Sequence, residues 1–519
     1  MEGINKSALL TAKIFLFFLI IIATIYVKEI KTYAASGEMF YFGGITEGSK
    51  LPKTIDSVIK SKSSSNGQTY TYKEVVALNG EVKIAECDMS IKTSGTVKGE
   101  SGSYTVTYDI KSKAGSEVAL NRNIALNVKY RIVDNQTVKD YTISKWTETI
   151  QIGEEEIYTL DEKQSTLNLP TIEYEAPAIT YFKTVISNEL VYINSTGDKV
   201  VVTHTGQSFG YNTHWSSVET ENIEARIEKF NSLGEGQLGY EKEPSMTMIL
   251  NLKPSVKMHK TLTYDVNTPY AIAFDGNYLE VISNSGGLVY EIVKAPLGTT
   301  LKLNEMKGTI SLPTFNEQEI LIAPKNIQIW NGNFAEEDIK KLFSMEILEG
   351  DTKYYVPNQA LTRSQFVRMI VKALGYEPYT DKKELAIFED VDQSHVNYGY
   401  VIKAWQEGIV MGTGDAHFNP DQTINRQEAF AIYMRALGLS NKANYNTSIT
   451  PFIDDNEIDL WAKRDILALF NLGLVKGDSG YVKPKSKISK AEGAALVNRM
   501  VDYLREGIEE DYVENLINY

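Results

Sequence analysis

The distribution of hydrophobic and polar positions divides the chain into two parts of different character. From residue 37 to about residue 325, short runs rich in Val, Ile, Thr and Tyr alternate with Gly, Asn, Asp and Ser, for example over 103–108, 199–203, 246–250 and 278–282. A period of two residues with frequent turn signals indicates antiparallel strands that bury one face. We therefore expect a mainly-β, sandwich-like N-terminal region.

Two stretches modify this expectation. Two prolines, Pro170 and Pro177, lie in the strand-poor stretch 167–177, which suggests a boundary between a β-rich domain over 37–166 and a second over 178–325. The glutamate-rich stretch 218–227 is compatible with a helical interlude among the strands.

From about residue 326 the pattern changes, and the same set of landmarks occurs three times. The segments 346–350, 408–412 and 473–477 end in glycine, and each is followed by a proline and then, six residues further on, by a cation: Arg363, Arg426 and Lys490. Corresponding landmarks are 62 to 65 residues apart. We assign the copies to 326–386, 387–447 and 448–505, followed by a tail over 506–519.

Each copy predicts two helices, which makes this part all-α. The first helix begins near Phe334, Val396 or Trp461 and ends at the glycine-containing turn. The second begins with a capping residue that is followed three positions later by Gln or Glu, as in 362–365, 425–428 and 489–492. One such pair of helices cannot bury its own apolar face, so the three copies are expected to pack together.

The N-terminus predicts export. Lys6 and Lys13 precede an apolar run over 14–27, and small residues follow at Ala34 and Ala35. This order is typical of a signal peptide, here residues 1–35, and cleavage would leave no membrane segment. An uncleaved N-terminal anchor is the alternative.

Charge and candidate chemistry add mainly exclusions. The formal net charge of −14 argues against a nucleic-acid partner. The single cysteine, Cys87, fits a small apolar core position better than a nucleophile. His204 and His214, with Glu219 and Glu221, match no zinc spacing, and we predict neither a metal nor a cofactor. Trp405 is expected in a packed helix face rather than at a sugar.

The three copies resemble the surface-layer homology (SLH) domain of bacterial cell-envelope proteins. The second copy carries the resemblance best, with Phe-Glu-Asp-Val over 388–391, Gly-Ile-Val-Met-Gly over 408–412 and Ile-Asn-Arg-Gln-Glu over 424–428. The resemblance implies a three-pronged pseudo-trimer around a central helical bundle. It also implies noncovalent binding of a secondary cell-wall polysaccharide, often one with a pyruvate ketal, in grooves between the copies.

The resemblance also implies the site residues. The cations Arg363, Arg426 and Lys490 would sit in the grooves, where a guanidinium fork or an ammonium at a helix N-terminus suits a carboxylate. The family's tryptophan position holds Trp461 and Phe334 in two copies but Val396 in the third, which is a poor surface for a sugar. The remaining candidates implied by the family motif are Asp390, Asp454, Gly412 and Gly477, and for the aspartates a role in a turn or cap is an equal alternative.

These observations lead us to expect a secreted protein on the wall of a bacterium with thick peptidoglycan, whose β-rich region is displayed as a noncatalytic structural or S-layer-associated module. Neighbouring S-layer proteins are expected partners besides the polysaccharide. The alternatives are a wall-anchored hydrolase that acts on polysaccharide or peptidoglycan, and an adhesin, each with its site in the β-rich region. No catalytic motif in this region favours the hydrolase.

Overall fold

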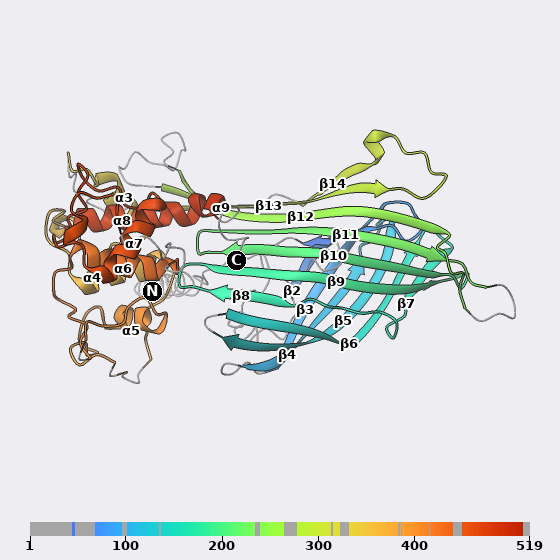
Figure 1. Cartoon of the computed structure of the whole chain (residues 1–519), viewed down its shortest axis with the longest axis horizontal. Coiled ribbons are helices and arrows are strands. Elements are labelled where there is room, and N and C mark those ends of the chain that lie inside the picture. Colours follow the sequence, from blue (N-terminus) through green and yellow to red (C-terminus); the bar gives the residue numbers. More distant parts are fainter. Residues whose placement is uncertain are drawn as a thin grey trace, which may run out of the picture. The chain divides into compact units, whose positions relative to one another are not determined.

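The alternating pattern of the first part forms strands that pair side by side in one antiparallel sheet (Figure 1). The computed structural model describes residues 44–46, 68–95, 101–133, 136–233, 239–263, 278–312, 315–321, 332–381, 385, 387–414, 416–439 and 449–511. The predicted signal segment 1–35 and residues 512–519 of the tail lie outside them. The described residues all belong to one compact unit.

Within the described residues, the sheet has fifteen strands. Their bounds are β1 Gly44–Thr46, β2 Gln68–Val76, β3 Lys83–Gly95, β4 Ser101–Ser112, β5 Val118–Val133, β6 Gln136–Ile152, β7 Glu156–Leu160, β8 Thr171–Glu175, β9 Thr180–Asn194, β10 Lys199–Asn212, β11 Ser216–Phe230, β12 Met246–Thr263, β13 Tyr278–Lys294, β14 Lys307–Ser311 and β15 Phe315–Leu321. Most neighbours in the sheet are also neighbours in sequence, so antiparallel hairpins build nearly all of it.

The sheet curls over a single core. Strand β1 lies near β12 and β13, and apolar side chains from the first and last strands belong to one buried cluster. Along β5, and along β11 from Glu219 to Ile227, alternate residues are buried, as one solvent-facing and one core-facing side require. This confirms the mainly-β, sandwich-like character of the region, although one continuous sheet forms it.

Two stretches differ from the sequence-based expectation. Residues 218–227 lie in β11 and are not helical: Ile223, Ala225 and Ile227 face inward, whereas the buried Glu219 and Glu221 obscure the period of two. Residues 167–177 contain β8, which pairs with β6 and β9, so strands before and after this stretch share one sheet. Pro170 and Pro177 flank β8, where neither removes a hydrogen bond from within the strand.

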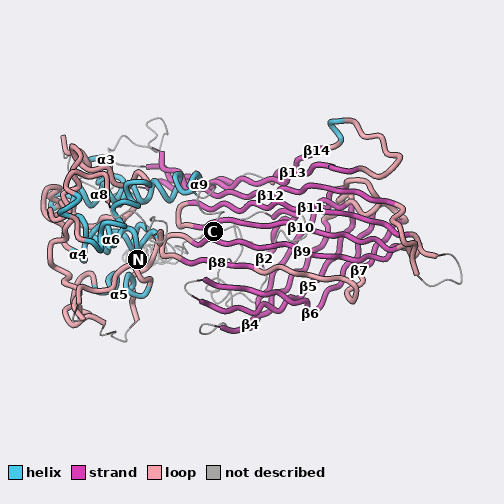
Figure 2. The backbone as a smooth tube through the Cα atoms, in the orientation of Figure 1, coloured by secondary structure: helices cyan, strands magenta, loops and turns pink. Residues whose placement is uncertain are grey.

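The three copies form pairs of helices, which confirms the all-α prediction (Figure 2). The first helices are α3 Glu336–Ser344, α5 Tyr398–Gln406 and α7 Leu460–Asn471, and the second helices are α4 Arg363–Ala373, α6 Arg426–Leu437 and α8 Lys490–Asp502. Thr362, Asn425 and Ser489 all form complete capping boxes. A π-helical turn Tyr503–Gly507 and the short α9 Ile508–Asp511 continue from α8. Within the described ranges, no helix is long and apolar enough to cross a membrane.

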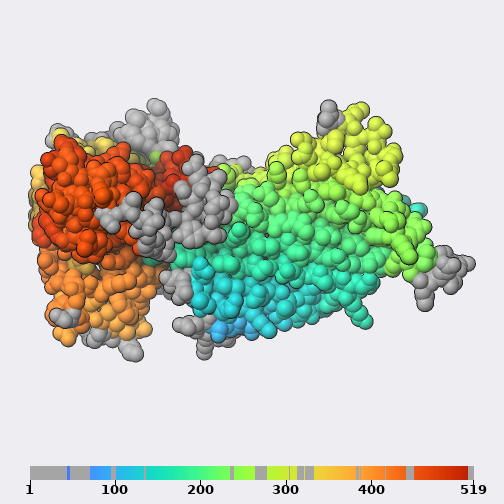
Figure 3. Space-filling view, viewed as in Figure 1, coloured from blue at the N-terminus to red at the C-terminus, as the bar shows by residue number. Residues whose placement is uncertain are grey.

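Three backbone hydrogen bonds close the copies into a ring. The amide of Leu361 donates to the carbonyl of Ile488 at 2.9 Å, the amide of Ile488 to that of Ile424 at 3.1 Å, and the amide of Ile424 to that of Leu361 at 3.0 Å. Each copy contributes one donor and one acceptor to this ring of three hydrogen bonds, so the ring needs all three copies. The orange and red atoms of the second and third copies accordingly pack into one surface (Figure 3).

Candidate functional site

The three predicted cations lie where the second helix of one copy meets the proline loop of the next. The amides of Arg363, Arg426 and Lys490 donate to the carbonyls of Gln422, Ser486 and Gln359 at 2.9, 3.0 and 2.8 Å. We call these places junctions 1, 2 and 3. The residue two positions before each loop proline lies beside the cation, and it is Phe418, Val482 and Tyr355 in that order.

At junction 1, Arg363 is a buried cation whose guanidinium is only partly engaged. Its Cζ lies 5.1 Å from the centroid of the Phe418 ring, and among the described residues Nε has no hydrogen-bond partner. Burial lowers the pKa of Arg363, and the charge of Glu428 opposes this shift. A buried guanidinium with a spare donor is costly unless an anion reaches it.

At junction 2, by contrast, the chain itself satisfies the cation. The Nε of Arg426 donates to the Val482 carbonyl at 2.7 Å, and Nη1 donates to the carboxylate of Glu492 at 2.9 Å. A ligand carboxylate would have to compete with Glu492 for this guanidinium.

At junction 3, the cation has an aromatic neighbour and no facing glutamate in the capping box. The Lys490 ammonium lies 5.6 Å from the Tyr355 ring centroid, and the Tyr355 hydroxyl donates to the Lys490 carbonyl at 3.1 Å. The capping-box position that holds Glu428 at junction 1 and Glu492 at junction 2 holds the neutral Gln365 here. Burial lowers the pKa of Lys490.

The position of the family's tryptophan is exposed in all three copies: Phe334 is 70%, Val396 80% and Trp461 52% exposed. Each precedes or begins a first helix that packs on the second helix of the preceding copy, since α5 contacts α4, α7 contacts α6 and α3 contacts α8. The cation of one copy therefore shares a junction with the aromatic position of the next.

The sequence alone does not predict this interleaving. A comparison of motifs within one copy pairs each cation with the aromatic position of the same copy, whereas the structure pairs it with that of the next copy. Two side-chain contacts establish the pairing: the Asn397 amide donates to the Ser364 hydroxyl at 3.1 Å, and the Gln427 amide donates to Asp459 at 2.6 Å. Junction 1 thus combines Arg363 with Val396, junction 2 combines Arg426 with Trp461, and junction 3 combines Lys490 with Phe334.

The predicted aspartates and glycines shape the loops. The carboxylate of Asp390 accepts from the amides of Phe418 and Asn419, and Asp454 accepts from the amides of Val482 and Lys483 at 2.9 and 2.7 Å. Both glycines, Gly412 and Gly477, have positive φ, and a Cβ on either would approach a loop carbonyl to 2.9 Å. These four residues hold the proline loops in place beside the cations.

Replacement of Asp454 by alanine is expected to lower the free energy of unfolding by about 1–3 kcal/mol, because two loop amides would lose their buried acceptor. Urea denaturation of the purified chain would measure the effect. The matched control is Asp478→Ala in the same loop, whose exposed carboxylate bonds Lys483 at the surface and whose loss should cost little. Equal effects of the two changes would contradict a structural role for Asp454.

The remaining candidates from the sequence are not gathered into a site. Among the described residues, no group of three or more His, Cys, Asp or Glu side chains is placed to hold a metal ion. Cys87 is buried, and burial raises the pKa of its thiol to about 12, as suits a packed position. Trp405 is 40% exposed, although Ile402 and Ile409 beside it are fully buried, so the predicted core position is wrong: Trp405 lies at the edge of the packed face.

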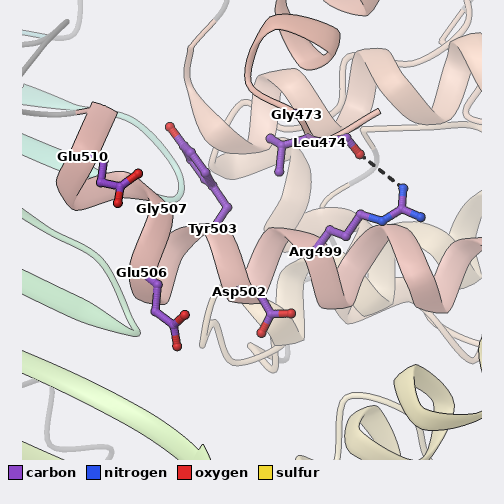
Figure 4. Close-up of a pocket in the computed structure, with 8 residues that line it drawn as sticks. All are labelled: Gly473, Leu474, Arg499, Asp502, Tyr503, Glu506, Gly507 and Glu510. Carbon is purple, nitrogen blue, oxygen red and sulfur yellow. Dashed lines mark hydrogen bonds between the residues drawn. The ribbon is translucent and has the colours of Figure 1, made fainter. Parts of the chain in front are cut away.

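One pocket of about 400 Å³ lies at the end of the third copy (Figure 4). Its lining includes Arg499, which donates to the Leu474 carbonyl, and the acidic residues Asp502, Glu506 and Glu510. None of the three cations lines this pocket, and sequence reasoning did not single it out.

Comparison with known proteins agrees with the repeat geometry. The family model of the S-layer homology domain matches residues 330–367, 387–430 and 451–494. An amylopullulanase of Thermoanaerobacterium thermosulfurigenes is 31% identical over 206 residues, which cover 39% of this chain and 11% of that protein. The exoglucanase XynX of Acetivibrio thermocellus is 32% identical over 173 residues, 33% of this chain and 16% of that enzyme. The S-layer protein EA1 of Bacillus anthracis is 26% identical over 167 residues, 32% of this chain and 19% of that protein.

The alignments thus span less than a fifth of the length of these relatives. The C-terminal part of the chain consists of three S-layer homology domains. Together with the surface proteins among its relatives, these domains indicate a secreted protein that is held at the cell wall or S-layer.

Proposed function

We propose that the three domains hold the chain on the wall by binding a secondary cell-wall polysaccharide at their junctions, and that the β-rich region is displayed as a noncatalytic structural module. The observation that carries this proposal is the state of the cations at junctions 1 and 3. Arg363 is buried with a spare donor, and Lys490 has no glutamate facing it in the capping box.

The chemistry of these junctions favours a saccharide that bears a carboxylate, such as a pyruvate ketal. A guanidinium binds a carboxylate through two parallel hydrogen bonds, and both cations lie at the first residue of a helix, where the free amide dipoles also favour negative charge. At junction 3 the exposed Phe334 ring can stack on the apolar face of a sugar. Junction 2 has the best aromatic surface, Trp461, but its arginine is already neutralised by Glu492.

The alternative of a wall-bound hydrolase draws on the relatives, some of which are named as glycan-degrading enzymes. A glycosidase needs two carboxyl groups that reach its substrate. In the curled sheet, Glu74, Glu148, Glu219 and Glu221 point inward and are at most 5% exposed. Two of them are bound to Arg122, which suits a structural role. We therefore favour the noncatalytic module.

Sedimentation of the purified chain with wall sacculi tests the binding. The chain should pellet with intact sacculi and remain in solution after chemical removal of the secondary polymers. Equal pelleting with stripped sacculi, or none with intact ones, would contradict the proposal.

The junctions can be tested by the double change Arg363→Ala and Lys490→Ala. Loss of charge-assisted hydrogen bonds at two junctions is expected to weaken binding by roughly 100- to 10,000-fold, because each such bond contributes about 1.5–3 kcal/mol to a buried contact and losses at separate junctions add. Arg363→Lys should give an intermediate affinity, since lysine keeps the charge and loses the fork. The control is Arg226→Ala on the outer face of β11. An unchanged affinity of the folded double variant would remove these residues from the site.

A further inference from the structure

The β-rich region touches the C-terminal ends of all three second helices. In the first copy, the indole Nε1 of Trp215 donates to the Ala373 carbonyl at 2.8 Å. In the second, a Cβ on Gly438, which ends α6, would lie 2.0 Å from the Cβ of Ala176, so the two backbones approach closely. In the third, the Leu504 carbonyl just beyond α8 accepts from the Ser216 hydroxyl at 2.6 Å.

The chain beyond the third copy strengthens this joint. Its π-helical turn places Arg505 where Nε donates to the Lys260 carbonyl at 3.1 Å, and Glu509 forms an ion pair with Lys257 on β12. A wider helical turn leaves carbonyls such as that of Leu504 available to partners outside the helix. The last described residues therefore bind the helical ring, that is, the three helical copies together, to the sheet.

The joint is packed as a protein core. Tyr211, Trp215 and Val218, around the β10–β11 turn, belong to the same buried cluster as the inner faces of α4, α6 and α8. Interiors of this kind resist relative motion because a displaced side chain has no alternative space to occupy. The connection is therefore rigid, unlike that of an exposed polar linker.

The three cations lie at the other ends of the same helices. Each second helix has 11 to 13 residues, so the cations lie about 16–20 Å from the joint at 1.5 Å per residue. In the β-rich region, β10 extends over 14 residues from the joint to the 195–198 turn. At about 3.3 Å per residue, this turn lies about 45 Å from the joint. The 153–155 turn lies at that same end, because β7 pairs with the last residues of β9.

From this arrangement we infer that the protein stands on the wall in one fixed orientation. The helix ends that bear the cations face the wall polymer, and the 153–155 and 195–198 turns form the end that faces away from it. This inference rests on the proposed function, since it takes the junctions as the wall-binding surface. It goes beyond that function by assigning which end of the β-rich region is available to the surroundings.

Single cysteines can test the orientation, because buried Cys87 should not react in the folded chain. Glu154→Cys places a thiol at the far turn, and Asp421→Cys places one on an exposed side chain next to Pro420, in the loop of junction 1. A maleimide attached to a bulky polyethylene glycol would be reacted with each variant, free and bound to sacculi. We expect binding to slow the reaction of Asp421→Cys at least several-fold and to leave that of Glu154→Cys unchanged.

The outcomes separate the inference from the function on which it rests. Sedimentation with equal slowing at both positions, or slowing at Glu154→Cys alone, would overturn the orientation and leave wall binding intact. Failure of both variants and the unaltered chain to sediment would overturn the proposed function and the orientation with it. Thermal melting of each variant would first establish that it folds like the unaltered chain.

Discussion

Replacement of Arg122 by methionine is expected to lower the free energy of unfolding by about 3–5 kcal/mol, a large fraction of the about 5–15 kcal/mol typical of a folded protein. The fully buried guanidinium of Arg122 donates to Glu148 at 2.7 and 2.8 Å and to Glu74 at 2.6 and 3.0 Å. Without it, two carboxylates would remain inside the sheet with no opposite charge.

Further hydrogen bonds surround this group and make its loss more severe. The Trp146 indole donates to Glu148 at 2.9 Å and the Tyr192 hydroxyl at 3.0 Å, whereas the Tyr72 hydroxyl donates to Glu74 at 2.5 Å. The network joins the hairpin β5–β6 to β2 and β9, which precede and follow it in the sequence. It thereby links inward-facing side chains of strands that are not all neighbours in the sheet.

Urea denaturation followed by circular dichroism would measure the loss, with Arg226→Met as the matched control. Arg226 lies on the solvent side of β11 and bonds Glu228 at the surface, so its removal should cost less than about 1 kcal/mol. Replacement of all three charges, with Arg122→Met, Glu74→Leu and Glu148→Leu together, should recover part of the stability, because no unpaired charge remains although Trp146, Tyr72 and Tyr192 lose their acceptors. If Arg122→Met alone were as stable as the Arg226→Met control, Arg122 would not be needed to compensate the two buried carboxylates.

The same variant should depend on pH in a defined direction. Burial raises the pKa of Glu74, and Arg122 opposes that shift. Because the folded state holds this proton more tightly than the unfolded chain, the stability contributed by Glu74 falls as the pH rises between the two pKa values. Loss of Arg122 enlarges the shift, so Arg122→Met should regain stability relative to the unaltered chain as the pH is lowered from about 7 to about 5. Parallel pH profiles of the two proteins would contradict this assignment.

The strands and helices could be predicted where one physical signal dominates. The capping boxes at Thr362, Asn425 and Ser489 use contacts within four residues, and the structure contains all three. The strand over 216–230 was not predicted from the sequence. Glu219 and Glu221 occupy inward positions in it, where an alternating pattern would place apolar residues. Local sequence cannot distinguish an inward glutamate from an exposed one.

Contacts between distant residues explain the remaining differences. Arg122, Glu74 and Glu148 have no sequence signal that joins them, because only the register of β5 against β6 places two of them side by side. The pairing of Arg426 with Trp461 likewise depends on the interleaving of copies, which no single copy encodes. The rigid joint could not be predicted either, because Trp215 lies in a turn whose partner, Ala373, is 158 residues away in sequence.

Replacement of Trp215 by alanine is the second change from which we expect a large effect, a loss of about 3–5 kcal/mol in the free energy of unfolding. The indole is 4% exposed, packs edge-on to His214 with ring centroids 5.1 Å apart, and donates to the Ala373 carbonyl. Alanine would leave a cavity between the sheet and the helical ring. It would also leave a buried carbonyl with no donor.

The effect should appear in the cooperativity of unfolding as well as in its midpoint. Since the joint packs as one core, the unaltered chain is expected to lose strand and helix signals in a single transition. In Trp215→Ala the two signals should separate, because each part then unfolds without the other. Trp215→Phe should keep most of the packing and lose only the hydrogen bond, at a cost of about 1–3 kcal/mol.

Trp405→Ala provides the control, because that side chain is 40% exposed at the edge of the packed face of α5, whereas Trp215 is 4% exposed. Its replacement should cost less and leave a single transition. If Trp215→Ala and Trp405→Ala lowered the stability equally, or if the strand and helix signals of Trp215→Ala still coincided, the joint would not couple the two parts. A separated transition that leaves binding to sacculi unchanged would instead show that the helical ring alone holds the wall polymer, while Trp215 determines the direction in which the β-rich region projects from it.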